Sequence, residues 1–123
     1  MAGKANKTTR PGPFMKLARP EMIEAVALAG FDFALVDVEH GPVSQSELYA
    51  VVMAAERRNL PLVVRVPVRE EPYIKWCLDP GVRHIQVPSV ETAEDAAFGV
   101  RNSYFNPPGM RGLCRFTRAA AFP

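Results

Sequence analysis

The sequence predicts an α/β fold with a parallel sheet, and three observations lead to this prediction. Short apolar runs alternate four times with longer amphipathic segments along the 123 residues, which is the order of strand–helix units. The runs at 33–38 and 60–68 are almost continuously apolar, as in strands that are buried on both faces. With 48% hydrophobic and 23% charged residues, the chain has the composition of one globular domain.

The first unit is predicted from its proline and its glycine. A short strand is expected at Phe14–Ala18 and a helix at Glu21–Ala29. Pro20 stands where the first turn of a helix tolerates proline, and Gly30 is placed to end the helix. The second strand then covers Phe33–Val38.

The second and third units have their own start signals. Ser44 and Glu47 have the spacing of a capping box, which predicts a helix from there to about Arg58. The third strand is expected at Leu60–Val68. A third helix begins near Pro72 and ends before a proline-glycine turn.

The fourth unit combines a strand at His84–Pro88 with a helix at Glu91–Arg101, and the stretch 102–123 is expected to be loop-like. We predict a disordered leader over residues 1–12 and a domain over 13–123. Two architectures fit four such units: an open doubly wound sheet, or part of a (β/α)8 barrel. No glycine-rich phosphate loop follows a strand, which weakens a nucleotide-binding interpretation.

Composition argues against several classes of partner. The net charge is +2, and no block of like charge follows the short basic leader, so nucleic acid is not an expected partner. No signal peptide and no bilayer-length apolar run are present, so we expect a cytoplasmic protein that does not contact membranes. Cys77 and Cys114 lack metal-site spacing, and we expect reduced, buried thiols, with a disulfide as the minority alternative.

Four charged or titratable residues stand near the carboxyl ends of two neighbouring predicted strands. Asp37, Glu39 and His40 close the second strand, and Arg65 lies in the third. Because side chains alternate along a strand, Asp37 and Glu39 point to the same face. Arg65 joins them there if the valine-rich faces meet the helices. Parallel α/β folds place their active sites at this end of the sheet, so the cluster is the candidate site.

Each residue of the cluster fits proton or anion chemistry. The Arg65 guanidinium suits a carboxylate or an enolate oxygen. His40 is a candidate for proton exchange near neutral pH, with Asp37 orienting its ring, and Glu39 would attract a metal ion or its waters. A structural alternative stays open, in which Arg65 is a core arginine paired with one of the acids and His40 caps a loop.

Other polar and aromatic residues carry weaker signals. We expect His84 to be structural or exposed, and Trp76 and Tyr73 to pack within the protein rather than to stack on a ligand. Asp79 most simply ends a helix. Arg111 is a candidate anion ligand, although a loop arginine is usually solvated.

In their order along the chain, these motifs resemble the HpcH/HpaI aldolase family, which includes 4-hydroxy-2-oxoheptanedioate and 2-dehydro-3-deoxyglucarate aldolases and macrophomate synthase. The resemblance covers about residues 14–122, and the segments that carry it are 27–32, 37–41, 63–66, 78–81, 86–90 and 107–112. The D-x-E-H segment followed by V-R and P-P-x-G-x-R-G is specific as an ordered set.

The resemblance implies a homo-oligomeric (β/α)8 barrel enzyme that uses a divalent metal (Mg, Mn or Co) to stabilise the enolate of pyruvate or a related 2-oxo acid. Such an enzyme makes or breaks a carbon–carbon bond to an aldehyde. By position, His40 resembles the catalytic base with Asp37 as its partner, and Arg65 the arginine that holds the 2-oxo group. Glu39 would lie near the metal's water ligands. Asp79 resembles an acid that reaches a neighbouring subunit's site.

The family takes its direct metal ligands, a Glu and an Asp, from later strands, so we expect none in this chain. A full barrel needs ~250 residues. We therefore expect this chain to be the N-terminal half of the barrel, about four βα units with parallel strands. Its origin would be a truncated gene, a partial gene model or a fragment. We expect the isolated chain to be inactive or nearly so. One alternative is a non-catalytic half-barrel that self-associates or binds a partner through its open edge. Another, an open-sheet small-molecule binder, lacks a phosphate-cradling loop.

Overall fold

The computed structural model describes residues 9–121, which form four β–α units in chain order. Residues 1–8 of the predicted leader lie outside the described residues. The elements are β1 (Phe14–Met15), α1 (Pro20–Leu28), β2 (Ala34–Asp37), α2 (Gln45–Arg57), β3 (Leu62–Arg65), α3 (Glu71–Leu78), β4 (His84–Gln86), α4 (Ala93–Ser103) and the 3-10 turn η1 (Arg118–Ala120).

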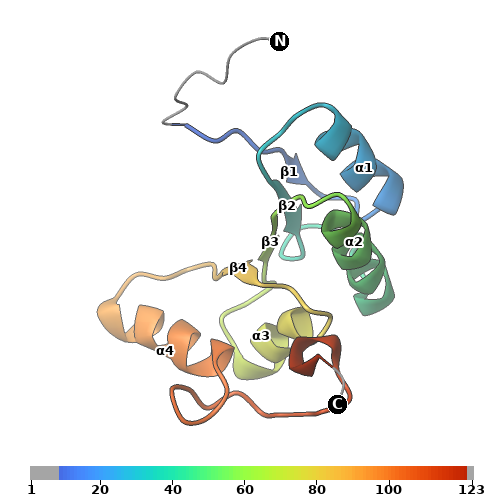
Figure 1. Cartoon of the computed structure of the whole chain (residues 1–123). Coiled ribbons are helices and arrows are strands. Elements are labelled where there is room, and N and C mark those ends of the chain that lie inside the picture. Colours follow the sequence, from blue (N-terminus) through green and yellow to red (C-terminus); the bar gives the residue numbers. More distant parts are fainter. Residues whose placement is uncertain (1–8, 122–123) are drawn as a thin grey trace.

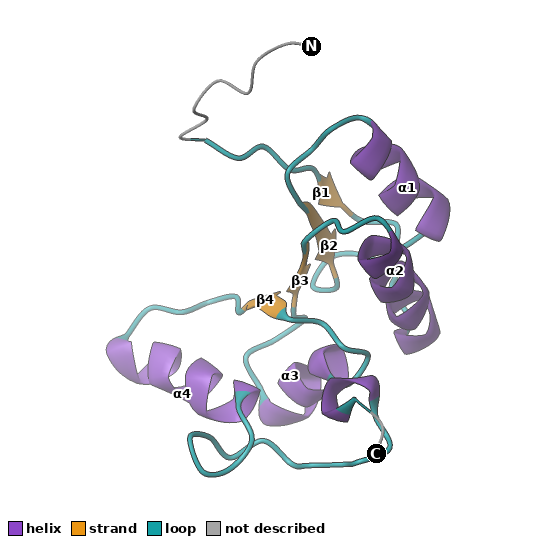
Figure 2. Cartoon of the chain, in the orientation of Figure 1, coloured by secondary structure: helices purple, strands orange, loops and turns teal. Residues whose placement is uncertain are grey.

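The four strands form one parallel sheet in the order β1-β2-β3-β4. This order resolves the choice that the sequence left open. A doubly wound sheet reverses its strand order and carries helices on both faces, whereas right-handed crossovers in sequential order place every helix on one face. Figures 1 and 2 show α1–α4 gathered on one side of a curved strip of strands. The predicted half of a (β/α)8 barrel is therefore confirmed as an α/β fold of four parallel strands alternating with helices.

The hydrophobic core lies between the sheet and the helices. Met15, Val36 and Val64 occupy one row across β1–β3, and all three are buried on the helix side. Ile23, Leu48, Val51, Ile74 and Cys77 cover them from α1, α2 and α3. The opposite face, which carries Phe14, Val63 and His84 in the neighbouring row, has no helix over it in Figure 1.

The predicted helix start is accurate where side chains cap the main chain through reciprocal hydrogen bonds. Both hydrogen bonds of the Ser44–Glu47 capping box are present at the start of α2. The predicted start of α4 at Glu91 is two residues early, because Thr92 is the cap and forms a second capping box with Asp95. The helix also continues past its predicted end, and the Ser103 hydroxyl donates a hydrogen bond to the carbonyl of Gly99 one turn back.

Several expectations about single residues need correction. Cys77 is buried as predicted, and burial raises the pKa of its thiol to about 12, but Cys114 is exposed because its loop leaves the core. Tyr73 is exposed on the outer face of α3, so the expectation that it packs is wrong, whereas Trp76 does pack against the core. His84 is exposed, one of the two outcomes expected for it. Within residues 9–121, the structure has no helix of the length and apolarity needed to cross a bilayer.

Candidate active site

The sheet register brings the predicted cluster together. Asp37 and Arg65 are direct neighbours at the carboxyl ends of β2 and β3. Two parallel hydrogen bonds join them, from Arg65 Nε to Asp37 Oδ1 at 2.9 Å and from Arg65 Nη2 to Asp37 Oδ2 at 2.8 Å. Arg65 Nε also lies 3.0 Å from Glu39 Oε2. The face predicted by strand alternation is therefore the face on which these three side chains meet.

Asp37 is the fixed anion of the cluster. It is 0% exposed, and its Oδ1 accepts the main-chain N–H groups of Glu39 at 3.0 Å and of His40 at 3.2 Å. The hydrogen bonds from Arg65, with the two main-chain donors, lower the pKa of the Asp37 carboxyl although burial opposes them. The carboxylate stays charged because both of its oxygens are satisfied.

Arg65 is held in one orientation and keeps donors to spare. Its side chain is 22% exposed, and its guanidinium lies over the Phe14 ring at 4.7 Å from the centroid. The neighbouring Asp37 carboxylate raises the pKa of the guanidinium. The acids engage Nε and Nη2, and no residue of the described chain takes Nη1. A planar fork with an unoccupied edge is suited to a carboxylate or an enolate oxygen.

His40 stands at the rim of the cluster with its side chain 63% exposed, and its Nε2 lies 3.8 Å from Glu39 Oε1. Asp37 accepts a hydrogen bond from the main-chain N–H of His40. Within the described residues, no hydrogen bond joins Asp37 to the imidazole ring of His40. The acid beside the imidazole is thus Glu39. The role of Asp37 as the partner of the ring stays a prediction.

Sequence reasoning missed two residues that shape this corner. Phe14 supplies the ring under Arg65, and the one usable signal in the sequence was an aromatic residue at the start of the first predicted strand. Gly41 follows the cluster where the chain passes close to itself, since a Cβ there would lie 2.2 Å from the Asp37 carbonyl oxygen and 2.7 Å from that of Lys16. Only glycine permits that approach.

Asp79 and Arg111 form a separate ion pair. Asp79 follows α3, which returns the chain to the amino ends of the strands, so it lies away from Asp37 and Arg65. Arg111 Nη2 donates to Asp79 Oδ1 at 2.7 Å, and the Arg111 guanidinium lies over the Phe105 ring at 4.5 Å. The Arg111 side chain is only 6% exposed, so the expectation of a solvated loop arginine is wrong.

The described residues do not fit a directly bound divalent cation. Residues 9–121 contain no group of three or more His, Cys, Asp or Glu side chains placed to hold a metal ion. The two carboxylates of the cluster are already engaged by Arg65, and a second cation between them would be repelled by the guanidinium.

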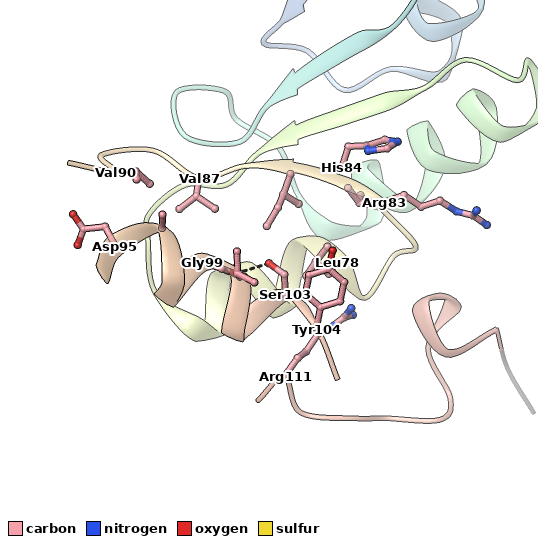
Figure 3. A pocket seen from close by; sticks show the side chains of 14 residues that line it. Leu78, Arg83, His84, Val87, Val90, Asp95, Gly99, Ser103, Tyr104 and Arg111 are labelled. Carbon is pink, nitrogen blue, oxygen red and sulfur yellow. Dashed lines mark hydrogen bonds between the residues drawn. The ribbon is translucent and has the colours of Figure 1, made fainter. Parts of the chain in front are cut away.

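A cavity of about 570 Å³ lies along the outer edge of the sheet, between β4 and α4. Figure 3 shows its walls, with Val87 and Val90 at one end, Gly99 and Ser103 on α4, and Arg111 at the far side. None of the four cluster residues lines it. This cavity and the charged cluster are therefore different places.

A sequential parallel sheet with an ion cluster at its carboxyl ends is the arrangement of one half of a (β/α)8 barrel. The chain belongs to the HpcH/HpaI aldolase/citrate lyase family, whose model matches residues 10–121.

Known relatives agree in sequence and in structure. The chain is 41% identical over 102 residues to a 5-keto-4-deoxy-D-glucarate aldolase of Klebsiella pneumoniae, a match that covers 83% of this chain and 40% of the relative. A crystal structure of an HpcH/HpaI aldolase/citrate lyase family protein from Burkholderia cenocepacia is 38% identical with a TM-score of 0.83, over 90% of this chain and 46% of that one. Macrophomate synthase is 30% identical with a TM-score of 0.77, over 88% and 37%. The chain spans about half the length, or less, of the relatives it matches.

Proposed function

We propose that this chain carries the substrate-binding and proton-transfer part of a carbon–carbon lyase site of the pyruvate aldolase type. The substrates would be 4-hydroxy-2-oxo acids, which are cleaved to a 2-oxo acid such as pyruvate and an aldehyde, or formed from them. One observation carries the proposal: Arg65 is fixed by Asp37 and Glu39 while its Nη1 edge is free of contacts within the described chain. The names of the relatives point to the same class of reaction.

Cleavage of a 4-hydroxy-2-oxo acid needs a base and a site for a developing anion. Loss of the proton from the C4 hydroxyl lets the C3–C4 bond break, and the bonding electrons pass into the enolate of the 2-oxo acid. A proton returned to C3 completes the reaction. The enolate oxygen forms beside the group that holds the 2-oxo function, so a fixed cation there stabilises the transition state.

The residues divide these tasks. Arg65 would bind the 2-oxo group and its enolate oxygen through Nη1. His40, exposed at the rim, would take the hydroxyl proton and return it, and Glu39 at 3.8 Å would stabilise the imidazolium formed in between. Asp37 would keep Arg65 in place, because reorientation of the guanidinium would break two hydrogen bonds at once.

By itself the 123-residue chain is expected to turn over little or no substrate, because the described residues supply no metal site of the kind that the family resemblance implies. Metal-dependent cleavage of a 4-hydroxy-2-oxo acid by the purified chain, abolished by Arg65→Ala, would overturn this expectation.

Binding tests the proposed site without turnover. We would measure the affinity of pyruvate for the wild-type chain, for Arg65→Lys and for Arg58→Lys by ligand-detected NMR. Arg58 is a matched control, since it is a partly exposed arginine paired with Glu24 away from the cluster. We expect Arg65→Lys to weaken binding about tenfold or more, because lysine loses the planar fork, and Arg58→Lys to leave it unchanged. Equal affinities for all three proteins would contradict the proposal.

A further inference from the structure

The row of residues that contains Asp37 and Arg65 continues onto the fourth strand. Asp37 pairs with Arg65 across β2 and β3, and Arg65 pairs with Gln86 across β3 and β4. Residues paired across parallel strands point to the same face of the sheet. Gln86 therefore lies on the helix-free face beside Arg65, on the side away from Asp37 (Figure 1). In a (β/α)8 barrel this face is the interior, and active sites lie at its carboxyl end.

Gln86 brings uncommitted polar groups to this row. The chain has two glutamines, and Nε2 of the other one, Gln45, donates to the Trp76 carbonyl at 3.1 Å. The side chain of Gln86 makes no hydrogen bond to the rest of residues 9–121. Its carboxamide offers two N–H donors and one carbonyl acceptor, so it is equipped to contact a polar ligand.

The main chain around Gln86 is fixed to the third unit. The Gln86 carbonyl accepts the N–H of Val66 at 3.0 Å. In the loop after β3, Arg69 donates from Nη1 to the Ser89 carbonyl at 3.0 Å and lies 2.5 Å from Asp95 Oδ1. Asp95 is itself the acid of the capping box of α4. The carboxyl ends of β3 and β4 are therefore tied together, and β4 keeps its side chain in place beside β3.

The unused edge of Arg65 is turned away from Asp37. The guanidinium faces the Asp37 carboxylate with Nε and Nη2, and in a planar guanidinium Nη1 then points in the opposite direction. Gln86 also lies on the far side of Arg65 from Asp37. Since neighbouring strands are about 4.8 Å apart, a small ligand held by Nη1 has the side chain of β4 as its neighbour across the sheet.

The order of the strands matches the order of groups in the proposed substrate. A 4-hydroxy-2-oxo acid carries its hydroxyl on C4, its oxo group on C2 and its carboxylate on C1. The proposed function gives the C4 hydroxyl to His40 after β2 and the 2-oxo group to Arg65 on β3. One strand further, the C1 carboxylate reaches β4 and Gln86. A carboxamide donates to a carboxylate without adding a charge to the cluster.

We propose that Gln86 is a further substrate-binding residue, which donates a hydrogen bond from Nε2 to the C1 carboxylate of the 2-oxo acid held by Arg65. The assignment rests on the proposed function, because Arg65 and His40 set the direction of the substrate. Gln86 then favours ligands with a free carboxylate over esters and ketones that have the same oxo group.

The side-chain amide signals of the two glutamines test this contact on the full chain. In a titration of ¹⁵N-labelled chain with pyruvate, the amide pair of Gln86, identified by its absence from the spectrum of Gln86→Leu, should shift and saturate. The amide pair of Gln45, bonded to Trp76, should stay in place. A pyruvate titration that saturates without moving the Gln86 signals would overturn the proposal.

Ligand discrimination separates a direct contact from a loss of structure. Gln86→Leu should weaken pyruvate binding about tenfold and leave the affinity for methyl pyruvate, whose carboxylate is esterified, unchanged. His84→Leu is the matched control, since His84 is exposed two residues earlier on the same strand and face, and it should change neither affinity. Equal weakening of both ligands by Gln86→Leu would overturn the proposal.

Arg65→Lys distinguishes the two ways of failing. If Arg65→Lys weakens pyruvate binding and Gln86→Leu does not, Gln86 makes no contact with the substrate and the proposed function stands. If neither variant weakens binding, the proposed function fails together with the role of Gln86.

Discussion

Replacement of Asp37 by alanine is the sharpest perturbation of the cluster. The Asp37 carboxylate is wholly buried and accepts four hydrogen bonds, two from Arg65 and one each from the main chain of Glu39 and His40. Loss of one partner of a buried ion pair typically costs about 3–5 kcal/mol. Arg65 keeps Glu39 and part of its solvent exposure, so we expect the lower end, about 3 kcal/mol of unfolding free energy.

Urea unfolding followed by the fluorescence of Trp76, the one tryptophan of the chain, measures this loss. Asp37→Asn is the companion variant, because it keeps the shape of the side chain and an acceptor for the main-chain donors. Asp37→Asn should lose less unfolding free energy, about 2 kcal/mol, because only the charge is missing. Glu39→Gln, whose parent side chain is 21% exposed, should lose the least unfolding free energy. An Asp37→Ala variant within about 0.5 kcal/mol of wild type, the range of ordinary surface substitutions, would refute this description of the cluster.

The same carboxyl sets a pH dependence. Because the pKa of Asp37 is lower in the folded chain than its ordinary value of 3.8, its contribution to stability is present above that value and is lost as pH falls through the folded pKa. The stability difference between wild type and Asp37→Asn should therefore be full at pH 6 and shrink below about pH 4. A difference that is constant from pH 6 to pH 3 would contradict the assignment.

Three further predictions concern the scaffold. Burial raises the pKa of Cys77 to about 12, so a thiol reagent at pH 8 should label Cys114 at once and Cys77 only in unfolded chains; rapid labelling of both would contradict the fold. Gly41→Ala should destabilise the chain in urea unfolding, because the new Cβ would meet the Asp37 carbonyl oxygen at 2.2 Å, and an unchanged midpoint would be evidence against that close approach. Ser44→Ala removes the cap of α2 and should cost about 1 kcal/mol by the same measurement; no loss would show that the cap does not contribute.

Local rules predicted most of the fold. The capping spacing of Ser44 and Glu47 identified the start of α2, and the period of two along β2 and β3 identified the shared face of Asp37 and Arg65. Both depend only on neighbours in sequence or on the geometry of one strand. The lengths of the strands were less predictable, because a strand lasts only as long as its pairing across the sheet: β1 is two residues long and pairs with β2 at Phe14 and Met15, against the five residues expected at 14–18.

What the sequence did not predict depends on long-range contacts. Arg111 is buried because Asp79 and Phe105 approach it from other segments, and the separation of 32 residues between Arg111 and Asp79 leaves no local signal. The main-chain donors to Asp37 were equally hidden, since they require the tight turn that ends at Gly41. The choice between barrel and open sheet needed the strand order, which periodicity does not contain.

The central claim is that Arg65, held by Asp37 and Glu39, is the part of the cluster that binds a 2-oxo acid. The most direct measurement is a titration of ¹⁵N-labelled chain with pyruvate, in which the side-chain Nε–H signal of Arg65 is followed by NMR. We predict a saturable shift of that signal in the wild-type chain. In folded Asp37→Asn the shift should be lost, because Arg65 no longer has the carboxylate that fixes it. A saturating titration that moves other signals and leaves Arg65 Nε–H in place would contradict the claim.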